Sequence, residues 1–481
     1  MLFNSYEFIF YFLPAVLIGY FLLNYAKQDT AAKIWLVAAS LYFYSFWNFN
    51  YLYLILASIL VNYAIGTYLS NASNLRVKKP VLTVGIVLNV LLLGYYKYTD
   101  FFLETINGFV ENDYSLLGLM LPLAISFFTF QQIAYLVDSY RMETKGYKIH
   151  DYMLFVIFFP QLIAGPIVHH REVMSQFQDS DNRRISMKHI SLGLFIFGVG
   201  LFKKVMIADT FAVWANDGYA RAADLYFVES WIASLSYTFQ LYFDFSGYCD
   251  MAMGAALLFN IRLPLNFNSP YKALNIQDFW RRWHITLSRF LTEYIYKPLG
   301  GNRISPSRTY INIFIIFMIS GFWHGAGWTF IIWGALHGVA SVIYRWWSRR
   351  GYSMPKILGW FITFQFVNMA WVFFRAESVG QALTMLKIMF GFENFILPAR
   401  VAAVVEQFSG VLLFPERASF YTSMSVGLIV IALAAVIWRP NSFQMMERFK
   451  PDGFRLMFIL VLFFVSVLQL GKVTEFLYFN F

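Results

Sequence analysis

The chain has 481 residues, of which 59% are hydrophobic, 21% are aromatic and only 13% are charged. Soluble domains carry about 25% charged residues, so this composition excludes a soluble globular protein and predicts an all-α polytopic membrane protein. The formal net charge is +10, but the basic residues lie in short loops between apolar runs, as in the positive-inside pattern, so no nucleic-acid binding is expected. Cys249 is the only cysteine, and neither Cys-x-x-Cys nor His-Glu-x-x-His spacing occurs, so no metal is expected.

The apolar runs are long enough to cross, or nearly cross, about 30 Å of hydrocarbon. Lys27 and Lys33 follow the first run, whereas the turn at residues 47–50 is uncharged, so the N-terminus is expected outside. The loop at residues 100–115 carries only acidic charges and is also expected outside. The predicted runs are residues 6–23, 34–49, 51–69, 80–98, 119–138, 151–168, 190–208, 231–258, 309–324, 327–347, 357–374, 423–438 and 456–470.

The run at residues 151–168 breaks the alternation, because basic loops flank it on both sides. It contains Phe159-Pro-Gln-Leu-Ile-Ala-Gly-Pro166, and this density of proline and glycine opposes a straight helix. We therefore predict a re-entrant segment, which protein or a water-filled cavity must surround. The acidic loop at 209–230 is then expected outside and the basic stretch at 262–308 inside.

Within the inside stretch, apolar residues recur at helical spacing from Ile276 to Tyr294, which predicts one interfacial amphipathic helix. His284 lies on it and is as readily explained by solvation as by function. Arg281, Arg282 and Arg289 can neutralise phosphates on the inner face or anchor lipid headgroups. The residues alone do not decide between these roles.

Runs 309–324 and 327–347 form a predicted hairpin whose turn contains His324. The first arm has about 16 residues, or roughly 24 Å, so the turn is expected within the membrane thickness. An ionisable group there is a candidate for function, and a histidine in a dry site can act as a general base on a hydroxyl. The alternative is a packing or interhelical hydrogen-bonding role. Gly321, Gly325 and Gly327 are expected to let a substrate approach the backbone.

Other polar residues receive weaker predictions. His337 is expected to form an interhelical hydrogen bond, whereas solvation is expected for His150, His169, His170 and His189. Asp244 and Asp250 lie inside an apolar run and need partners, and Asp244 is expected to orient a histidine or pair with an arginine. The segment at 377–421 is too polar to span and is expected to form outside-facing or interfacial helices. On the residues alone, acyl transfer and secondary transport both remain open.

Several motifs resemble the membrane-bound O-acyltransferase (MBOAT) family, most closely its bacterial alginate O-acetyltransferase (AlgI-like) branch. They are Arg282-Trp-His-Ile-Thr-Leu-Ser288, Tyr296-Lys-Pro-Leu-Gly-Gly-Asn-Arg303, Gly321-Phe-Trp-His-Gly-Ala-Gly-Trp-Thr-Phe330, Trp333-Gly-Ala-Leu-His-Gly338 and Asn368-Met-Ala-Trp-Val-Phe-Phe-Arg-Ala-Glu377. The resemblance covers essentially the whole chain, residues 1–481, as one transmembrane domain. It implies a ring of about 11–12 transmembrane helices, with re-entrant and interfacial helices, around a thinned central pore.

The resemblance also implies that His324 is the family's essential membrane-embedded histidine and His284 its second, inner-side histidine. It implies acetyl-CoA as the donor, a bacterial inner membrane, and an extracytoplasmic polysaccharide such as alginate as the acceptor. A periplasmic SGNH-type acetyltransferase (AlgJ- or AlgX-like) and the polysaccharide synthesis and export machinery are the implied partners. The alternatives are D-alanyl or other acyl transfer (DltB-like), and a transporter or flippase of an acylated carrier.

Overall fold

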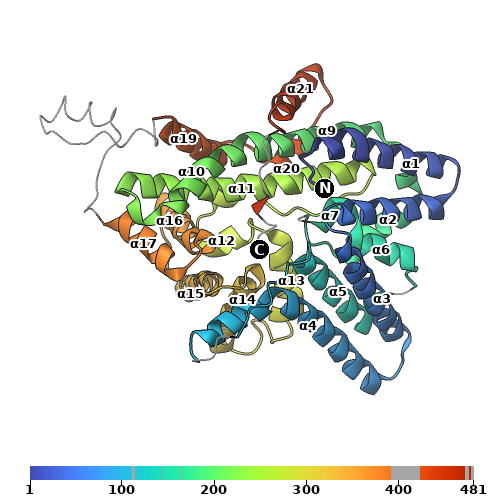
Figure 1. The fold of residues 1–481 in the computed structure, drawn as a ribbon, viewed down its shortest axis with the longest axis horizontal. Coiled ribbons are helices and arrows are strands. Elements are labelled where there is room, and N and C mark those ends of the chain that lie inside the picture. Colours follow the sequence, from blue (N-terminus) through green and yellow to red (C-terminus); the bar gives the residue numbers. More distant parts are fainter. Residues whose placement is uncertain (111–113, 145, 164, 392–422, 472–475, 478–481) are drawn as a thin grey trace, which may run out of the picture.

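The computed structural model describes residues 1–110, 114–144, 146–163, 165–391, 423–471 and 476–477, and every regular element in these ranges is a helix (Figure 1). Among the described residues, five helices are long and apolar enough to cross a membrane: Glu7–Tyr25, Asn50–Asn71, Leu75–Asn107, Met187–Ala220 and Lys356–Arg375. The shorter apolar helices are Val379–Phe390, Met424–Trp438 and Gly453–Val467. The chain is thus an all-α multi-pass membrane protein, and the ring of spans around a pore stays a prediction.

The first helices follow the predicted runs with shifted ends. They are η1 (Glu7–Phe12), α1 (Leu13–Tyr25), α2 (Asp29–Ser45), α3 (Asn50–Asn71), α4 (Leu75–Asn107) and α5 (Ile125–Tyr140). α4 continues to Asn107, so the first half of the predicted 100–115 loop is helical, and Gly108 N–H closes it on Glu104 O at 3.1 Å. α5 starts six residues later than the run at 119, because Pro122 and the left-handed backbone of Ala124 interrupt the helix.

The segment at 151–168 is broken, as its prolines predict. It contains α6 (Ile149–Ile157) and α7 (Phe159–Leu162), and α8 (His170–Gln178) follows it. Phe158 separates α6 from α7 with a non-helical ψ of 112°, and Pro160 lies in the first turn of α7, where its missing N–H is not needed. Both short helices are almost entirely buried. A re-entrant path through the membrane stays a prediction.

One long helix extends through the first half of the predicted outer loop at 209–230. It consists of α9 (Met187–Phe202), the π-helical turn η3 (Lys203–Ala208) and α10 (Asp209–Ala220). The prediction was wrong because it counted Asp209 as a loop charge, whereas Lys204 Nζ pairs with Asp209 Oδ1 at 2.8 Å. This helix packs along α11 (Phe227–Leu258), as Figure 1 shows. A Cβ added to Gly200 would lie 2.6 Å from Gly247 O, so the two backbones touch.

The inner stretch is not one helix. α12 (Ile276–Trp280) ends before a turn at residues 281–284, and α13 (Ile285–Leu291) and η6 (Thr292–Tyr296) follow. The aromatic stripe also does not face a membrane interface, since Trp280 and Trp283 are buried. Trp283 packs against Trp371 with ring centroids 5.0 Å apart, so the protein itself covers the predicted interfacial face.

The predicted hairpin is present as α14 (Pro306–His324) and α15 (Trp328–Arg349). Its first arm has 19 residues, because the Ser305 side chain caps the Arg308 N–H and starts the helix early. At 1.5 Å per residue this arm is about 28 Å long, so its length alone does not place the turn inside the membrane. Figure 1 shows α12 and α13 between α11 and this hairpin.

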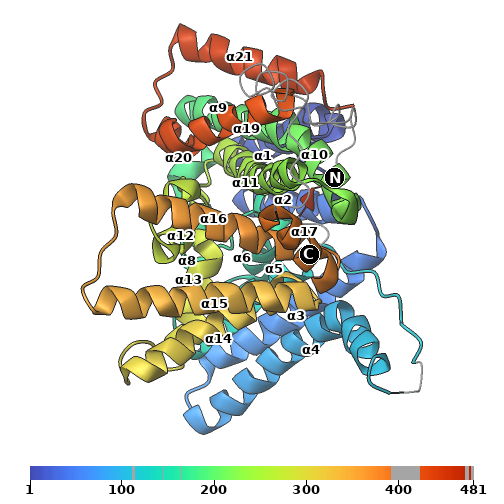
Figure 2. The ribbon, with the colours of Figure 1, turned by 90° about the vertical axis from the view of Figure 1, so that its left-hand side faces the viewer.

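The remaining helices are α16 (Lys356–Arg375), α17 (Val379–Phe390), α19 (Ser423–Trp438), α20 (Ser442–Glu447) and α21 (Gly453–Val467). Figure 2 shows α16 beside α15, and α19 and α21 on the far side of α11 from that hairpin. Of the predicted short helices at 377–421, α17 is described, and residues 392–422 lie outside the described ranges.

Candidate active site

The fold brings the two predicted histidines together. His324 is the last residue of α14, and His284 lies at the start of α13. Their ring centroids are 6.4 Å apart. Their exposed fractions are 2% for His324 and 0% for His284, so the solvated alternative for His284 is wrong. Two imidazoles 40 residues apart in sequence therefore share one buried site.

The backbone and the ring of His284 are both constrained. Its φ of 44° and ψ of 54° lie in the left-handed region, which non-glycine residues adopt rarely and mostly where the surroundings enforce it. Ile285 N–H donates to Asn266 O at 3.0 Å, which holds the turn. The sequence pattern could not show this turn, because it extended the helical spacing through it.

Asn266 fixes the proton on the His284 ring. Thr286 N–H donates to Asn266 Oδ1 at 3.3 Å, which identifies that atom as the amide oxygen. His284 Nδ1 lies 3.1 Å from the same oxygen and therefore carries the proton that it donates. The other ring nitrogen, Nε2, is then the basic one. Asn266 is fully buried, and its role was not predictable from the sequence, because a lone asparagine before a motif carries no signal.

Aromatic rings surround His324. The ring centroids of Trp323, Trp333 and Phe374 lie 5.0, 5.1 and 5.1 Å from that of His324. These side chains are buried and keep the site dry, which strengthens electrostatic and hydrogen-bonding interactions within it.

The glycines of the hairpin serve packing. A Cβ at Gly321 would lie 2.4 Å from Phe330 O, and one at Gly325 would lie 2.1 Å from the Phe330 ring. The expectation that these two glycines leave room for a substrate is therefore wrong, because α15 fills that room. At Gly327 an added Cβ would meet only ordinary contacts, at 3.6 Å.

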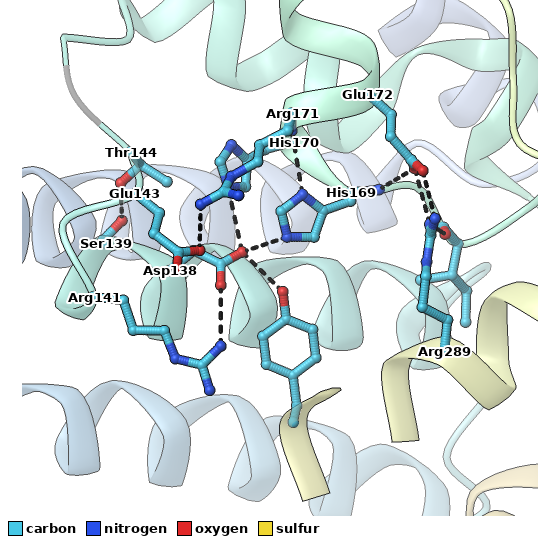
Figure 3. A network of polar contacts seen from close by, with 12 residues as sticks. Asp138, Ser139, Arg141, Glu143, Thr144, His169, His170, Arg171, Glu172 and Arg289 are labelled. Carbon is cyan, nitrogen blue, oxygen red and sulfur yellow. Dashed lines mark hydrogen bonds and ion pairs between the residues drawn. The ribbon is translucent and has the colours of Figure 1, made fainter. Parts of the chain in front are cut away.

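The three predicted arginines lie in different surroundings. Arg282 Nε donates to Asp278 Oδ1 at 2.9 Å, and Arg289 forms an ion pair with both carboxylate oxygens of Glu172 (Figure 3). Arg281 instead lines a cavity of about 230 Å³ between α12, α13, α14 and α15. The structure thus separates Arg281 from the two arginines that already have acidic partners.

This cavity has an apolar wall with a few polar groups. Its polar lining includes Ser288, Ser320 and Arg345. Ser320 lies one helical turn before His324 on α14, and Ser288 lies one turn after His284, where Ser288 N–H donates to His284 O at 3.1 Å. The remaining lining residues are Gln277, Trp280, Leu287, Leu291, Thr292, Ile313, Ile316, Phe317 and Ser341. Two of the residues that line the cavity therefore lie one helical turn from the two histidines.

His169 and His170 are not solvated as predicted. Their Nε2 atoms lie 2.8 and 3.2 Å from Asp138 Oδ2, to which Tyr294 also donates, so the cluster joins α5, α8 and η6 (Figure 3). Burial lowers the pKa of His170. The Asp138, His169 and His170 ligand atoms lie within 4.8 Å of one another, a spacing that can hold a metal ion.

The tautomer of His169 indicates that hydrogen bonds hold this cluster together. Its Nδ1 accepts the Arg171 N–H at 3.3 Å, so its Nε2 carries the proton and donates to Asp138. In this arrangement, hydrogen bonds to Asp138 connect α5, α8 and η6.

Asp244 and Asp250 both have the charged partners that buried carboxylates need. The partner of Asp244 differs from the histidine or arginine that was predicted. Lys204 Nζ lies 2.7 Å from Asp244 Oδ1, and Lys203 Nζ lies 2.7 Å from Asp250 Oδ2. Asp244 therefore pairs with a lysine and not with an arginine or a histidine. For His337 the predicted interhelical hydrogen bond is confirmed, since Trp280 Nε1 donates to His337 Nδ1 at 3.2 Å.

The family of the chain follows from comparison with known proteins. The model of the MBOAT, membrane-bound O-acyltransferase family matches residues 45–379. The chain is 53% identical over 427 residues to the peptidoglycan O-acetyltransferase of Helicobacter pylori, covering 82% of this chain and 81% of that protein. It is 39% identical over 406 residues to the probable alginate O-acetylase AlgI of Pseudomonas aeruginosa, covering 82% and 76%.

A more distant relative is the teichoic acid D-alanyltransferase of Bacillus subtilis. It is 27% identical over 273 residues, which cover 53% of this chain and 69% of that protein. The family match spans well over half of the chain, and it includes both buried histidines and the whole α14–α15 hairpin. The chain belongs to the membrane-bound O-acyltransferase family and is an O-acyltransferase.

Proposed function

We propose that the chain passes an acetyl group from cytoplasmic acetyl-CoA across the membrane for the O-acetylation of an extracytoplasmic polysaccharide. The observation that carries this proposal is the buried pair of His284 and His324, with ring centroids 6.4 Å apart and the His284 proton fixed by Asn266. Neutral imidazoles in a dry site are suited to moving a proton between an alcohol and a thiol. An acetyl group is short, so its transfer at the two histidines does not require a long acyl-binding tunnel.

In the proposed reaction His324 accepts the proton of the attacking hydroxyl. The hydroxyl oxygen bonds to the thioester carbonyl carbon, the carbon–sulfur bond breaks, and the coenzyme thiolate takes up the proton. General-base assistance of this kind contributes about 10²- to 10⁴-fold. His284 positions the thioester from the inner side. The proton on its Nδ1 leaves Nε2 as the nitrogen that can accept a hydrogen bond from the incoming group.

The cavity beside α12 and α14 supports a coenzyme A thioester as donor. Arg281 and Arg345 supply positive charge for phosphate oxygens, and the apolar wall suits the pantetheine arm. Ser288 and Ser320 offer hydroxyls on the path toward the histidines. Arg282 and Arg289, which already pair with acidic residues, are assigned to positioning α12, α13 and α8 and not to the donor.

For the acceptor we propose peptidoglycan first, because the relative named for it is 53% identical, against 39% for the alginate O-acetylase. Both acceptors lie outside the cytoplasmic membrane, which supports a bacterial inner-membrane location. The charges of the first loops support an N-terminus outside. A periplasmic SGNH-type acetyltransferase is the proposed recipient that passes the acetyl group to the glycan.

Reconstituted protein tests the reaction directly. Purified protein in lipid nanodiscs is given acetyl-CoA labelled in the acetyl group, together with peptidoglycan fragments or alginate oligomers and the periplasmic partner. We expect label in the glycan, at least about 100-fold less with His324→Ala, and little change with His150→Ala as the matched control. Equal labelling by folded His324→Ala protein would show that His324 is not the base.

The same assay separates the arginines and the rival functions. Arg281→Ala is expected to raise KM for acetyl-CoA, whereas Arg282→Ala is expected to leave it unchanged in folded protein. Equal KM values for both variants would remove Arg281 from the donor site. Labelling only with a D-alanyl donor would favour the D-alanyl alternative. Movement of an acylated carrier across the bilayer without covalent transfer would favour the flippase.

A further inference from the structure

We infer that Lys97 is a positioning residue that holds the last turn of α14, and with it His324, in the reactive geometry. This inference rests on the proposed role of His324 as the base. Lys97 lies on α4, which contacts this turn from a part of the chain more than 220 residues away. The sequence alone does not indicate this role, because Lys97 lies at the end of an apolar run, where a lysine is ordinarily a membrane anchor.

The contacts are concentrated on the carbonyl groups that end α14. Lys97 Nζ donates to Trp323 O at 2.6 Å and to His324 O at 3.1 Å. Its third hydrogen bond reaches Ser126 Oγ on α5 at 3.2 Å. The three donors of one ammonium group thus join α4, α5 and the histidine-bearing end of α14.

The neighbouring residue on α4 completes the cap. Tyr98 OH donates to Phe322 O at 2.6 Å, and the Tyr98 and Phe322 rings stack with centroids 4.0 Å apart. Three successive carbonyls, those of Phe322, Trp323 and His324, therefore accept hydrogen bonds from two adjacent side chains of another helix. Hydrogen bonds to three successive carbonyls fix both the position of the helix end along its axis and its rotation about that axis.

A helix end inside a protein needs this kind of partner. The last four carbonyls of an α-helix have no intrahelical donor, and a cation near them also complements the helix dipole. The α14 end is buried, since His324 is 2% exposed, so water does not readily serve these carbonyls. The chain then turns sharply through Gly325 to Gly327, so no further helical turn serves them either.

The partners of the Lys97 charge also differ from those of the partly buried Lys203 and the buried Lys204. Lys203 and Lys204 each lie 2.7 Å from a carboxylate oxygen, whereas the hydrogen bonds and ion pairs of Lys97 within the described residues involve carbonyl and hydroxyl oxygens only. A cation on a membrane-spanning helix is costly, and such residues are retained mainly where they serve function. Its positive charge beside His324 also suits the negative charge that develops on the acyl oxygen.

Variants at position 97 separate the effect of the hydrogen bonds to the α14 carbonyls from the effect of the positive charge. Lys97→Met removes both, Lys97→Gln keeps N–H donors without the charge, and Lys97→Arg keeps donors and charge. Lys78→Met is the matched control, because Lys78 is a buried lysine at the opposite end of α4 whose Nζ contacts Met142 Sδ. Each variant is purified by size exclusion, and kcat and KM for acetyl-CoA are measured in the nanodisc assay.

For Lys97→Met we expect kcat to fall by about 100-fold with KM for acetyl-CoA within about twofold of wild type, because small displacements of a reacting group have effects of this size. Lys97→Arg is expected to recover at least about a tenth of the wild-type kcat. Lys78→Met is expected to keep the wild-type kcat. Folded Lys97→Met protein with a wild-type kcat would overturn the inference, as would an equal fall in kcat for Lys78→Met.

If Lys97→Met does not fold, Lys97→Gln decides, because it retains donors for the carbonyls. A folded Lys97→Gln variant that keeps at least about a tenth of the wild-type kcat supports the role of the hydrogen bonds. A fall of about 100-fold in Lys97→Gln that Lys97→Arg does not show would assign the effect to the charge and overturn the positioning role. Failure of the proposed function looks different. In that case the wild type transfers no label, or His324→Ala transfers as much as the wild type, whatever the variants at position 97 do.

Discussion

Replacing Asn266 by leucine removes the oxygen that orients His284 while nearly conserving the side-chain volume. Two donors then lose their acceptor and cannot turn elsewhere: the His284 Nδ1–H and the Thr286 backbone N–H. The Thr286 hydroxyl also donates to Asn266, at 2.9 Å, but it can rotate. Asn266→Leu therefore tests whether the ring proton of His284 matters to the chemistry.

The expected magnitude follows from these contacts. A buried donor without an acceptor costs about 1–3 kcal/mol, so two fixed donors predict a loss of about 2–6 kcal/mol in the free energy of unfolding. Loss of the fixed tautomer is expected to lower kcat by about 100-fold, at the low end of general acid–base contributions. Asn266→Asp keeps an acceptor oxygen at the same place and is expected to retain more activity than Asn266→Leu.

Label transfer per folded protein and thermal unfolding are measured on the same preparations. Asn89→Leu is the matched control, since Asn89 is a buried asparagine whose amide group donates to Asn62 Oδ1 at 2.7 Å and to Gly85 O at 2.8 Å. It is expected to lose stability but keep kcat. If Asn266→Leu loses stability yet keeps the wild-type kcat, the tautomer argument is refuted.

Further predictions concern packing, buried charge and metal. Gly334→Val is expected to lower the yield of folded protein, because a Cβ there would lie 2.6 Å from Phe317 O; size exclusion checks it. Asp250→Asn is expected to cost about 3–5 kcal/mol by leaving the charge of Lys203 without its partner, as thermal unfolding would show. Dialysis against a chelator is expected to leave label transfer unchanged, because Asp138 already accepts hydrogen bonds at the cluster that has metal-ligand spacing.

Each of these predictions has a contrary outcome. Gly427→Val serves as the control for the hairpin, since an added Cβ at Gly427 meets nothing within 4 Å, and equal yields would refute the packing argument. The double variant Lys203→Met/Asp250→Leu should be more stable than Asp250→Asn alone. Activity that is lost on chelation and restored by added zinc would contradict the prediction for the cluster.

The hairpin and His324 were predictable because their signals are local. Two apolar runs around a polar, glycine-rich turn define both arms within about 40 residues, and the structure places His324 at the last position of α14. The family resemblance also rested on such contiguous motifs. The prediction for the inner stretch failed for the same reason, since helical spacing continues through His284 although its backbone does not.

The residues that orient the site could not be found in this way. Asn266 contacts the His284 ring from the irregular segment before α12, and Lys97 reaches the end of α14 from more than 220 residues away. Neither stands in a motif, and an asparagine or a lysine beside an apolar run has ordinary explanations. Their significance depends on which helix ends and rings lie opposite them, which only the tertiary structure determines.

The glycine contact within the hairpin has a consequence for motion. The Cβ position of Gly321 lies 3.1 Å from Gly334 Cα, so α14 and α15 meet backbone to backbone at this crossing. Closely packed elements move as units, and displacement occurs at looser boundaries. Opening of the site during turnover is thus expected to carry both arms together. The hairpin is expected to move relative to α12 and α13, because the cavity lies between these helices and the hairpin.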